Sequence, residues 1–298
     1  MAGQIEGGDK FIKQQEGIRF YCKHLVSLAG SYAQLDSSGE ATGHVDAFSF
    51  SGFVISIRGV WSLVTAGHIV RKLDIQLAKK EIVLTSCKLL DGWGVDAKHK
   101  EAIPVVDYEG MACYDVYDED YGLDFALIYL SPYYVRLLEA NGIVPISERN
   151  WLQQHKVEFS EHFILGLPTE VMQRSPDGSK LTPKPMIIPL NKMDAAPAGS
   201  EKPFPRFVGK IFDNVTLSDI DGLSGGPIIG VGDGGDGKRR YWIVAIQSGW
   251  IKRKRIVFGC PVTVFTTLVD EQLNQVAEEL TSANERKIGR ASTDIAGE

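Results

Sequence analysis

The distribution of apolar residues along the chain is typical of short β-strands rather than of long helices. Nine segments are rich in β-branched and aromatic residues, and Gly, Asp, Asn or Pro interrupts the chain between them. These predicted strands cover residues 24–32, 50–58, 61–66, 124–130, 163–167, 186–190, 226–231, 241–248 and 255–265. Many short strands with few helices indicate an all-β sandwich or barrel.

Two segments are predicted to be helical. Residues 131–142 begin with Ser-Pro, a favourable N-cap followed by a favourable first helical residue, and end with the stop signal Asn-Gly. Residues 267–280 carry apolar side chains on one face, and we expect the polar remainder of the chain to form a frayed tail. The Pro-rich segment 181–207 is expected to be a long irregular excursion.

Composition and charge exclude several classes of protein. Hydrophobic residues make up 44% of the 298 residues and charged residues 23%, which is ordinary for a soluble globular protein. A net charge of −6 argues against a nucleic-acid partner. No apolar run approaches the ~18 residues of a membrane span, and the N-terminus lacks the apolar core of a secretory signal. We therefore expect a cytoplasmic protein with neither a nucleic-acid nor a membrane partner.

The cysteines and histidines give no sign of a disulfide framework or a metal site. The four cysteines are widely spaced, form no C-x-x-C pair and are expected to be reduced thiols. Five histidines lack the spacing of metal ligands, so no metal or cofactor is expected: His24, His44, His99, His155 and His162. GVGDGG at 230–235 matches a dinucleotide fingerprint but precedes a strand, which indicates a hairpin loop. KRKR at 252–255 is likewise expected at a solvated hairpin tip.

Three short stretches carry the residue types needed for nucleophilic catalysis. DGLSGGPIIG (221–230) places Ser224 among glycines, which are favoured where the backbone must turn tightly. A serine hydroxyl needs a positioned base to become nucleophilic, and His68 is expected where strand 61–66 gives way to a turn. Asp124 begins an apolar strand, where a carboxylate is costly unless it has a hydrogen-bond partner. The acids of the preceding stretch 114–121 are expected in a solvated loop.

The three stretches resemble the motifs of one enzyme family. TAGH, DFAL and GLSGGP are similar to the TAAH, D-I/F-A-L and GDSGGP motifs of the trypsin/chymotrypsin-like serine proteases, in the family's order His, Asp, Ser. The similarity spans roughly residues 25–280 and is greatest to bacterial cytosolic trypsin-like peptidases. It implies an all-β fold of two six-stranded antiparallel β-barrels, chymotrypsin-like, with a C-terminal helix. The implied division is an extension (1–20), a first barrel with connector (21–142), a second barrel (143–265) and a helix with tail (266–298).

The resemblance also implies a role for each candidate residue. It makes the chain a serine endopeptidase that hydrolyses a polypeptide substrate through an acyl-enzyme. Ser224 would be the nucleophile, His68 the general base and Asp124 the group that orients the imidazole. The backbone amides of Gly222 and Ser224 would form the oxyanion hole.

Other positions bear on activation and specificity. Secreted digestive members of the family have an aspartate before the nucleophile that pairs with a newly cleaved N-terminus, but this chain has Leu223. Activation by N-terminal cleavage is therefore not expected. By the same analogy, Ser218 would lie at the base of the primary substrate pocket. Ser248 and Gly249 would form the wall along which the peptide pairs, with a preference for a small or medium apolar residue.

Two further classes stay open at this stage. The same fold could be a catalytically silent binding module that grips a peptide or protein, or an esterase. A regulatory protein partner fits the resemblance as well, and the sequence does not specify an oligomeric state.

Overall fold

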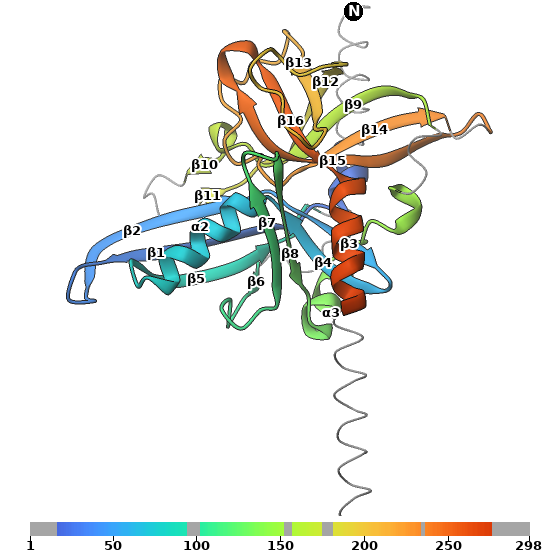
Figure 1. The fold of residues 1–298 in the computed structure, drawn as a ribbon. Coiled ribbons are helices and arrows are strands. Elements are labelled where there is room, and N and C mark those ends of the chain that lie inside the picture. The colour runs from blue at the N-terminus through green and yellow to red at the C-terminus, as the bar shows by residue number, and fades with distance from the viewer. Residues whose placement is uncertain (1–16, 94–101, 152–156, 175–180, 234–235, 276–298) are drawn as a thin grey trace, which may run out of the picture.

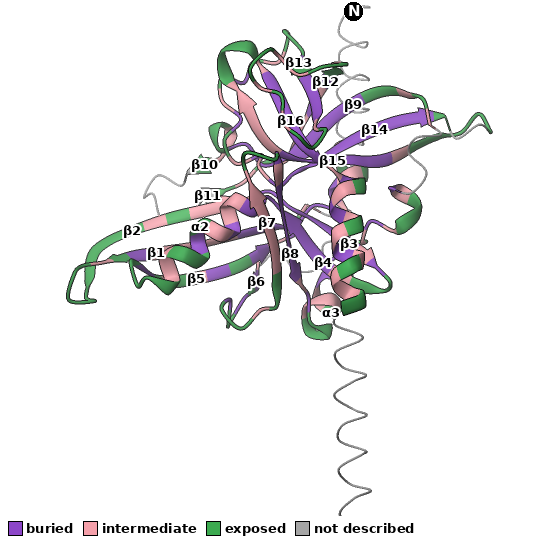
Figure 2. Ribbon diagram, viewed as in Figure 1, coloured by how far each residue is buried: buried purple, intermediate pink, exposed green. Residues whose placement is uncertain are grey.

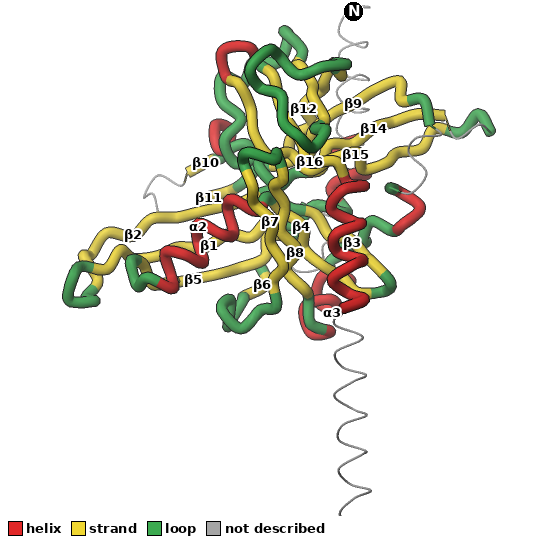
Figure 3. Tube along the Cα trace, in the orientation of Figure 1, coloured by secondary structure: helices red, strands yellow, loops and turns green. Residues whose placement is uncertain are grey.

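The computed structural model describes residues 17–93, 102–151, 157–174, 181–233 and 236–275 (Figure 1). Strands dominate and form two groups that meet near the middle of the molecule (Figure 3). Residues 262–275 are helical and follow the last strand directly. The expected all-β fold with a C-terminal helix is therefore confirmed, although the helix starts five residues earlier than predicted, and residues 276–280 lie outside the described residues.

The N-terminal half consists of two four-stranded antiparallel sheets, an arrangement consistent with the expected double-barrel fold. A bridge between Leu25 and Phe53 joins the two sheets. Beyond this bridge, the hairpin of β1 (Ser27–Leu35) and β2 (Ala41–Phe50) extends away from the second sheet and ends in an exposed turn (Figure 2). In spatial order the sheets are β2 (Ala41–Phe50), β1 (Ser27–Leu35), β5 (Ile82–Leu90) and β6 (Ile103–Pro104), and β3 (Phe53–Ile57), β4 (Val60–Thr65), β8 (Leu123–Tyr129) and β7 (Cys113–Asp118).

The second half is a closed antiparallel barrel of six strands, as expected. The strand predicted at 186–190 is confirmed as β12 (Met186–Lys192), which pairs with both β9 and β13, so the irregular excursion expected over 181–207 is confined mainly to residues 193–206. A short hairpin of β10 (Gln173–Arg174) and β11 (Leu181–Thr182) lies outside the barrel. The barrel order is β12 (Met186–Lys192), β13 (Phe207–Ile211), β16 (Ile256–Pro261), β15 (Arg239–Ile251), β14 (Pro227–Asp233) and β9 (Phe159–Gly166).

Two local predictions around the candidate residues were also wrong. The segment after β4 is not a turn but the helix α2 (Gly67–Ala78), because Val70, Leu73 and Leu77 recur at helical spacing and pack against the sheets. The acids before Asp124 do not lie in a solvated loop. They belong to β7, which pairs with β8 over its whole length, and only Glu119 and Asp120 lie in the turn that follows. The predicted helix at 131–142 is confirmed as α3 (Pro132–Ala140).

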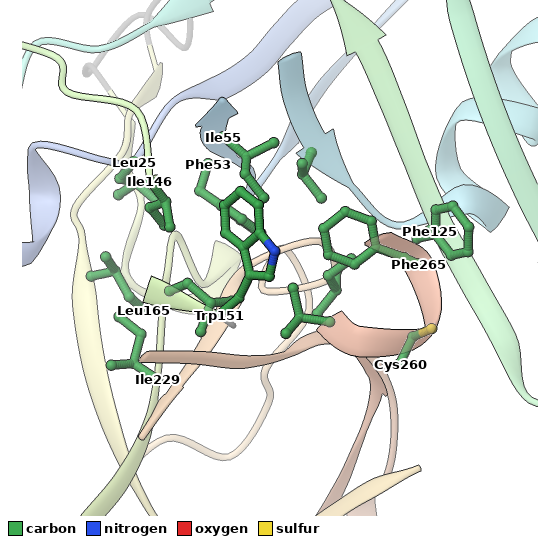
Figure 4. Packing of buried hydrophobic residues seen from close by; sticks show 14 of the residues in the cluster. Leu25, Phe53, Ile55, Phe125, Ile146, Trp151, Leu165, Ile229, Cys260 and Phe265 are labelled. Atoms are coloured by element: carbon green, nitrogen blue, oxygen red, sulfur yellow. The ribbon is translucent and has the colours of Figure 1, made fainter. Parts of the chain in front are cut away.

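Three large clusters of buried apolar residues hold the described part of the chain together, and a fourth, small one contains Val208, Ile256 and Phe258. One fills the space between the two N-terminal sheets, and one fills the barrel. The third lies between the halves and is shown in Figure 4, where Trp151 stands at its centre with Ile55, Ile146 and Phe265 around it. Trp151 is 3% exposed and Phe265 fully buried. Since both halves and the C-terminal helix contribute to this joint core, the loops that face each other across it are held in place.

All four cysteines have free thiols, and all but Cys113 are buried. No helix within the described residues is both long and apolar enough to cross a membrane.

Candidate active site

His68 and Asp124 form a pair with two hydrogen bonds. His68 lies in the first turn of α2, and Asp124 is the second residue of β8. One carboxylate oxygen, Oδ1, accepts the backbone N–H of His68 at 2.9 Å, and Oδ2 lies 2.7 Å from His68 Nδ1. A carboxylate can only accept, so Nδ1 carries the hydrogen and the neutral ring keeps its lone pair on Nε2. The carboxylate is 8% exposed and the imidazole 34%, so a buried acid orients an accessible base.

The start of α2 is packed closely against the strand that carries Asp124. A Cβ atom on Gly67 would lie 2.5 Å from Val116 O and 2.7 Å from Phe125 O, so only glycine fits there. Arg71, one turn further along α2, donates from Nε to the Asp115 carboxylate at 2.9 Å and from Nη1 to the carbonyl of Tyr117 at 2.7 Å. These contacts fix the helix against β7 and β8 and so fix the position of His68.

A buried thiol of the second half lies beside Asp124. Cys260 on β16 is fully buried and lies close enough to Asp124 for that residue to influence its pKa. Burial raises the pKa of this thiol to about 11. It is therefore a neutral packing group and adds no negative charge beside the carboxylate.

The loop that carries Ser224 is pressed against the end of β4. Gly225 has a φ of +88°, and a Cβ there would collide with Thr65 Oγ1 and Ser51 O and would lie 2.8 Å from Ala66 N. The amide of Gly225 donates to Gln247 O at 2.8 Å, which ties the loop to β15 as well. The half-buried Ser224 is therefore next to a residue that touches Thr65 and Ala66, immediately before α2.

The structure thus brings the three candidate catalytic residues to one place but does not join them all. No hydrogen bond connects Ser224 with His68 in the part of the chain that the structure describes. In ligand-free enzymes such bonds are often long and tighten when substrate binds.

The two candidate oxyanion-hole amides are free to donate to a ligand. Within the described residues, neither the Gly222 amide nor the Ser224 amide donates to another protein group. The Gly222 carbonyl is held by Ser51, whose Oγ donates to it at 2.5 Å and accepts the Leu167 N–H at 2.8 Å. Ser51 comes from the N-terminal half and Gly222 from the other, so this bond crosses the joint between them.

The candidate pocket residues have different surroundings. Ser218 is exposed, and its hydroxyl donates to Glu170 at 2.9 Å. Ser248 and Gly249 are half-buried near the end of β15, where the register between β15 and β16 shifts. As expected, KRKR forms the connection between β15 and β16. It is tied down at both ends, by the ion pair of Lys252 with Asp219 and by hydrogen bonds from Arg255 to nearby carbonyls.

One hollow on the described surface lies elsewhere. It measures about 1510 Å³ and is lined by the segment that starts at Gly17 and by β9, β12 and β15. His68, Asp124 and Ser224 do not line it. No group of three or more His, Cys, Asp or Glu side chains among the described residues is placed to hold a metal ion.

Comparisons with known proteins give structural neighbours only. No protein-family model matches the chain, and no curated protein does. Among solved structures, the chain is similar to an HtrA-type protease, AlgW, solved with a decapeptide, at 11% identity and a TM-score of 0.45. The match covers 85% of this chain and 65% of AlgW. It is also similar to a thermostable serine protease, AL20, from an extremophilic microorganism, at 13% identity and a TM-score of 0.36 over 78% of this chain and 90% of that one. The fold assignment therefore rests on the strand topology of the chain itself.

Sequence reasoning missed the residues that support the candidate site. Ser51 and Gly222 are far apart in the sequence, and nothing in the residues around Ser51 signals that its hydroxyl reaches the Ser224 loop. Glu170 and Thr169 follow the Gly-Leu-Pro at the end of β9 and were likewise not singled out. Their contacts depend on how the barrel closes, which a local pattern does not encode.

Proposed function

We propose that this protein is a serine endopeptidase that uses His68, Asp124 and Ser224. The observation that carries the proposal is the doubly hydrogen-bonded pair of His68 and Asp124 beside the loop of Ser224. An accessible imidazole with a buried carboxylate on Nδ1 is the arrangement needed for a general base.

The reaction follows from these groups. Ser224 Oγ attacks the carbonyl carbon of the scissile peptide bond and passes its proton to His68 Nε2. Asp124 stabilises the imidazolium that forms, and the amides of Gly222 and Ser224 donate to the oxyanion. His68 then protonates the leaving amine, the C–N bond breaks, and an ester to Ser224 remains. A water molecule, deprotonated by His68, cleaves that ester and frees the serine.

The substrate pairs with the end of β15, at Ser248 and Gly249, because the pairing of β14 with β15 ends at Ile246. An extended peptide can add to a free strand edge there through backbone hydrogen bonds, which give affinity without requiring a particular side chain. This placement leaves Ser218 as the candidate for the far end of the pocket.

A fluorophosphonate probe tests the proposal. We expect the wild type to be labelled, and Ser224→Ala and His68→Ala to be unlabelled. The double variant should be no worse than either single variant, because these residues act as a unit. Ser38→Ala, in the exposed turn between β1 and β2, is the matched control and should label at the wild-type rate.

The other outcomes separate the competing functions. A folded wild-type protein that is never labelled would favour the silent binding module. Labelling that proceeds equally in Ser224→Ala would refute the nucleophile. Hydrolysis of an activated ester without any cleavage of a denatured protein would favour the esterase.

A further inference from the structure

A short turn after β9 holds the loop that precedes Ser224. The 3₁₀ turn η3 (Thr169–Val171) follows Pro168 and lies against residues 218–222. The carboxylate of Glu170 accepts three hydrogen bonds from that loop. They come from the amide of Ser218 at 3.0 Å, its hydroxyl at 2.9 Å and the amide of Asp219 at 2.7 Å.

The same turn fixes the direction of the Gly222 amide. The Thr169 N–H donates to Asp221 O at 2.7 Å. That carbonyl and the Gly222 N–H belong to one planar trans peptide unit, in which the two groups point in opposite directions. With the carbonyl held at Thr169, the Gly222 N–H must point away from the turn. A rotated peptide unit would give up the bond to Thr169.

The fit around this peptide leaves little room for movement. Gly222 has a φ of +88°, and a Cβ there would lie 2.6 Å from Leu167 O and 2.7 Å from Thr169 Oγ1. Ser51 holds the next carbonyl along the chain, that of Gly222 itself. Leu223 is fully buried beyond it and packs into the barrel core, which also anchors the loop.

From these contacts we infer that Glu170 is a positioning residue for the oxyanion hole. Its three hydrogen bonds hold the start of the loop, Thr169 beside it holds the Asp221 carbonyl, and together they orient the Gly222 amide in the intact chain. The inference rests on the proposed peptidase function and adds to it a means of ordering the site that needs no cleavage of the chain.

The Glu170 carboxylate is in the charge state that accepts these hydrogen bonds best near neutral pH. Hydrogen bonds from the Asp219 amide and the Ser218 hydroxyl lower the pKa of this carboxyl below its usual 4.5. The group is therefore ionised throughout the neutral range, and hydrogen bonds to an ionised acceptor are stronger than those between neutral groups.

The test compares Glu170→Gln and Glu170→Ala with the wild type and with Glu139→Gln, an exposed matched control on α3. Two rates are measured in each protein: fluorophosphonate labelling of Ser224, which needs the oxyanion donors, and modification of His68 by diethyl pyrocarbonate, which does not. Peptide mass analysis separates His68 from the other histidines. Thermal denaturation checks that each variant is folded.

We expect Glu170→Ala to label about 10–100-fold more slowly, short of the ~10²–10³ typical for the complete loss of an oxyanion donor. Glu170→Gln should fall between it and the wild type, because its amide oxygen still accepts. The His68 modification rate and the melting temperature should stay at wild-type values in both. Glu139→Gln should be unchanged in every measurement.

Three results would overturn the inference or its premise, and they are distinguishable. Wild-type labelling rates in Glu170→Ala would remove Glu170 from the site while leaving the proposed function intact. A parallel fall in labelling and in His68 modification would show a general structural role instead. An unlabelled wild type would refute the peptidase function itself.

Discussion

Replacing Gly225 by alanine tests the contact that brings the Ser224 loop against the end of β4. The new methyl group would collide with Thr65 Oγ1 and the carbonyl of Ser51, and would lie 2.8 Å from the amide nitrogen of Ala66. Two of these three atoms are backbone atoms, which cannot move without shifting β4 or the start of β3. The loop is therefore the part that has to give way, and it carries Ser224 with it.

The expected loss of stability has two parts. Alanine at a φ of +88° pays a conformational penalty of about 1–2 kcal/mol. Inserting a methyl group into a filled space typically costs a further 1–3 kcal/mol or so. For a chain of this size, a total of about 2–5 kcal/mol corresponds to a fall in melting temperature of roughly 5–15 °C.

A matched control separates the two parts. Gly39 in the turn between β1 and β2 has a φ of +84°, but a Cβ there would have no atom within 4 Å. Gly39→Ala should show only the conformational penalty, roughly 2–5 °C in melting temperature. The difference between the two variants measures the close approach of the loop to β4.

The assay is thermal denaturation combined with fluorophosphonate labelling under conditions where each variant is folded. Gly225→Ala should lose most of its labelling, whereas Gly39→Ala should label like the wild type. Equal melting temperatures for the two variants, with full labelling of Gly225→Ala, would refute the packing of Ser224 against the His68 segment.

Two further predictions concern buried titratable groups. Asp124→Asn should keep the fold but lower the turnover of the proposed peptidase by about 10⁴-fold, because an amide no longer fixes the useful tautomer of His68. Near-wild-type turnover would redirect the search to Asp118, Glu119 or Asp120. Burial lowers the pKa of His24 from 6.5 to about 4, so the folded state favours the neutral ring. Its contribution to stability is then complete above pH 6.5 and is lost as the pH falls from 6.5 towards 4, on the order of 3 kcal/mol in all. Urea denaturation across this range should show the loss, and His24→Gln should reduce it; an unchanged pH dependence in that variant would contradict the assignment.

The contacts of His24 explain why the folded state favours its neutral ring. Its Nδ1 lies 2.5 Å from the carbonyl of Val144, which can only accept, so Nδ1 carries the hydrogen. Nε2 lies 2.6 Å from the hydroxyl of Tyr241 on β15 and accepts from it. Protonating Nε2 would remove that acceptor in a site where His24 is 3% exposed.

Five of the six barrel strands could be predicted from the sequence, because their apolar runs are bounded by turn residues, but β13 was missed because Gly209 and Lys210 interrupt its apolar residues. Strand β2 could not be predicted, since most of its residues are exposed and carry no alternation of apolar and polar positions. Strand β7 was hidden by its acids, which suit a strand whose exposed face meets water. The start of α2 was obscured by the strong β-signal that ends at Thr65 and by Gly67, although Val70, Leu73 and Leu77 carry a helical period.

The residues of the candidate site also fall into two groups, those that the sequence could reveal and those that it could not. His68, Asp124 and Ser224 stand in short motifs whose residue types report their chemistry directly. Ser51, Thr169 and Glu170 act through backbone groups of a loop that is distant in sequence. A hydrogen bond to a backbone amide leaves no mark on the identity of the residue that donates it, so such supports become visible only when the barrel is closed.

The apolar cluster of Figure 4 is shared by both halves, so neither half can bury its own apolar surface alone. Separation would expose Phe53, Ile55 and Phe125 on one side and Leu165 and Ile229 on the other, a surface too apolar to face water unprotected. The groups proposed to carry the chemistry are divided along the same line, with the base on one side and the nucleophile on the other. Docking of the halves and creation of the site are therefore a single event, and a nascent chain has no complete site until its last barrel strand and the helix beyond it have been made.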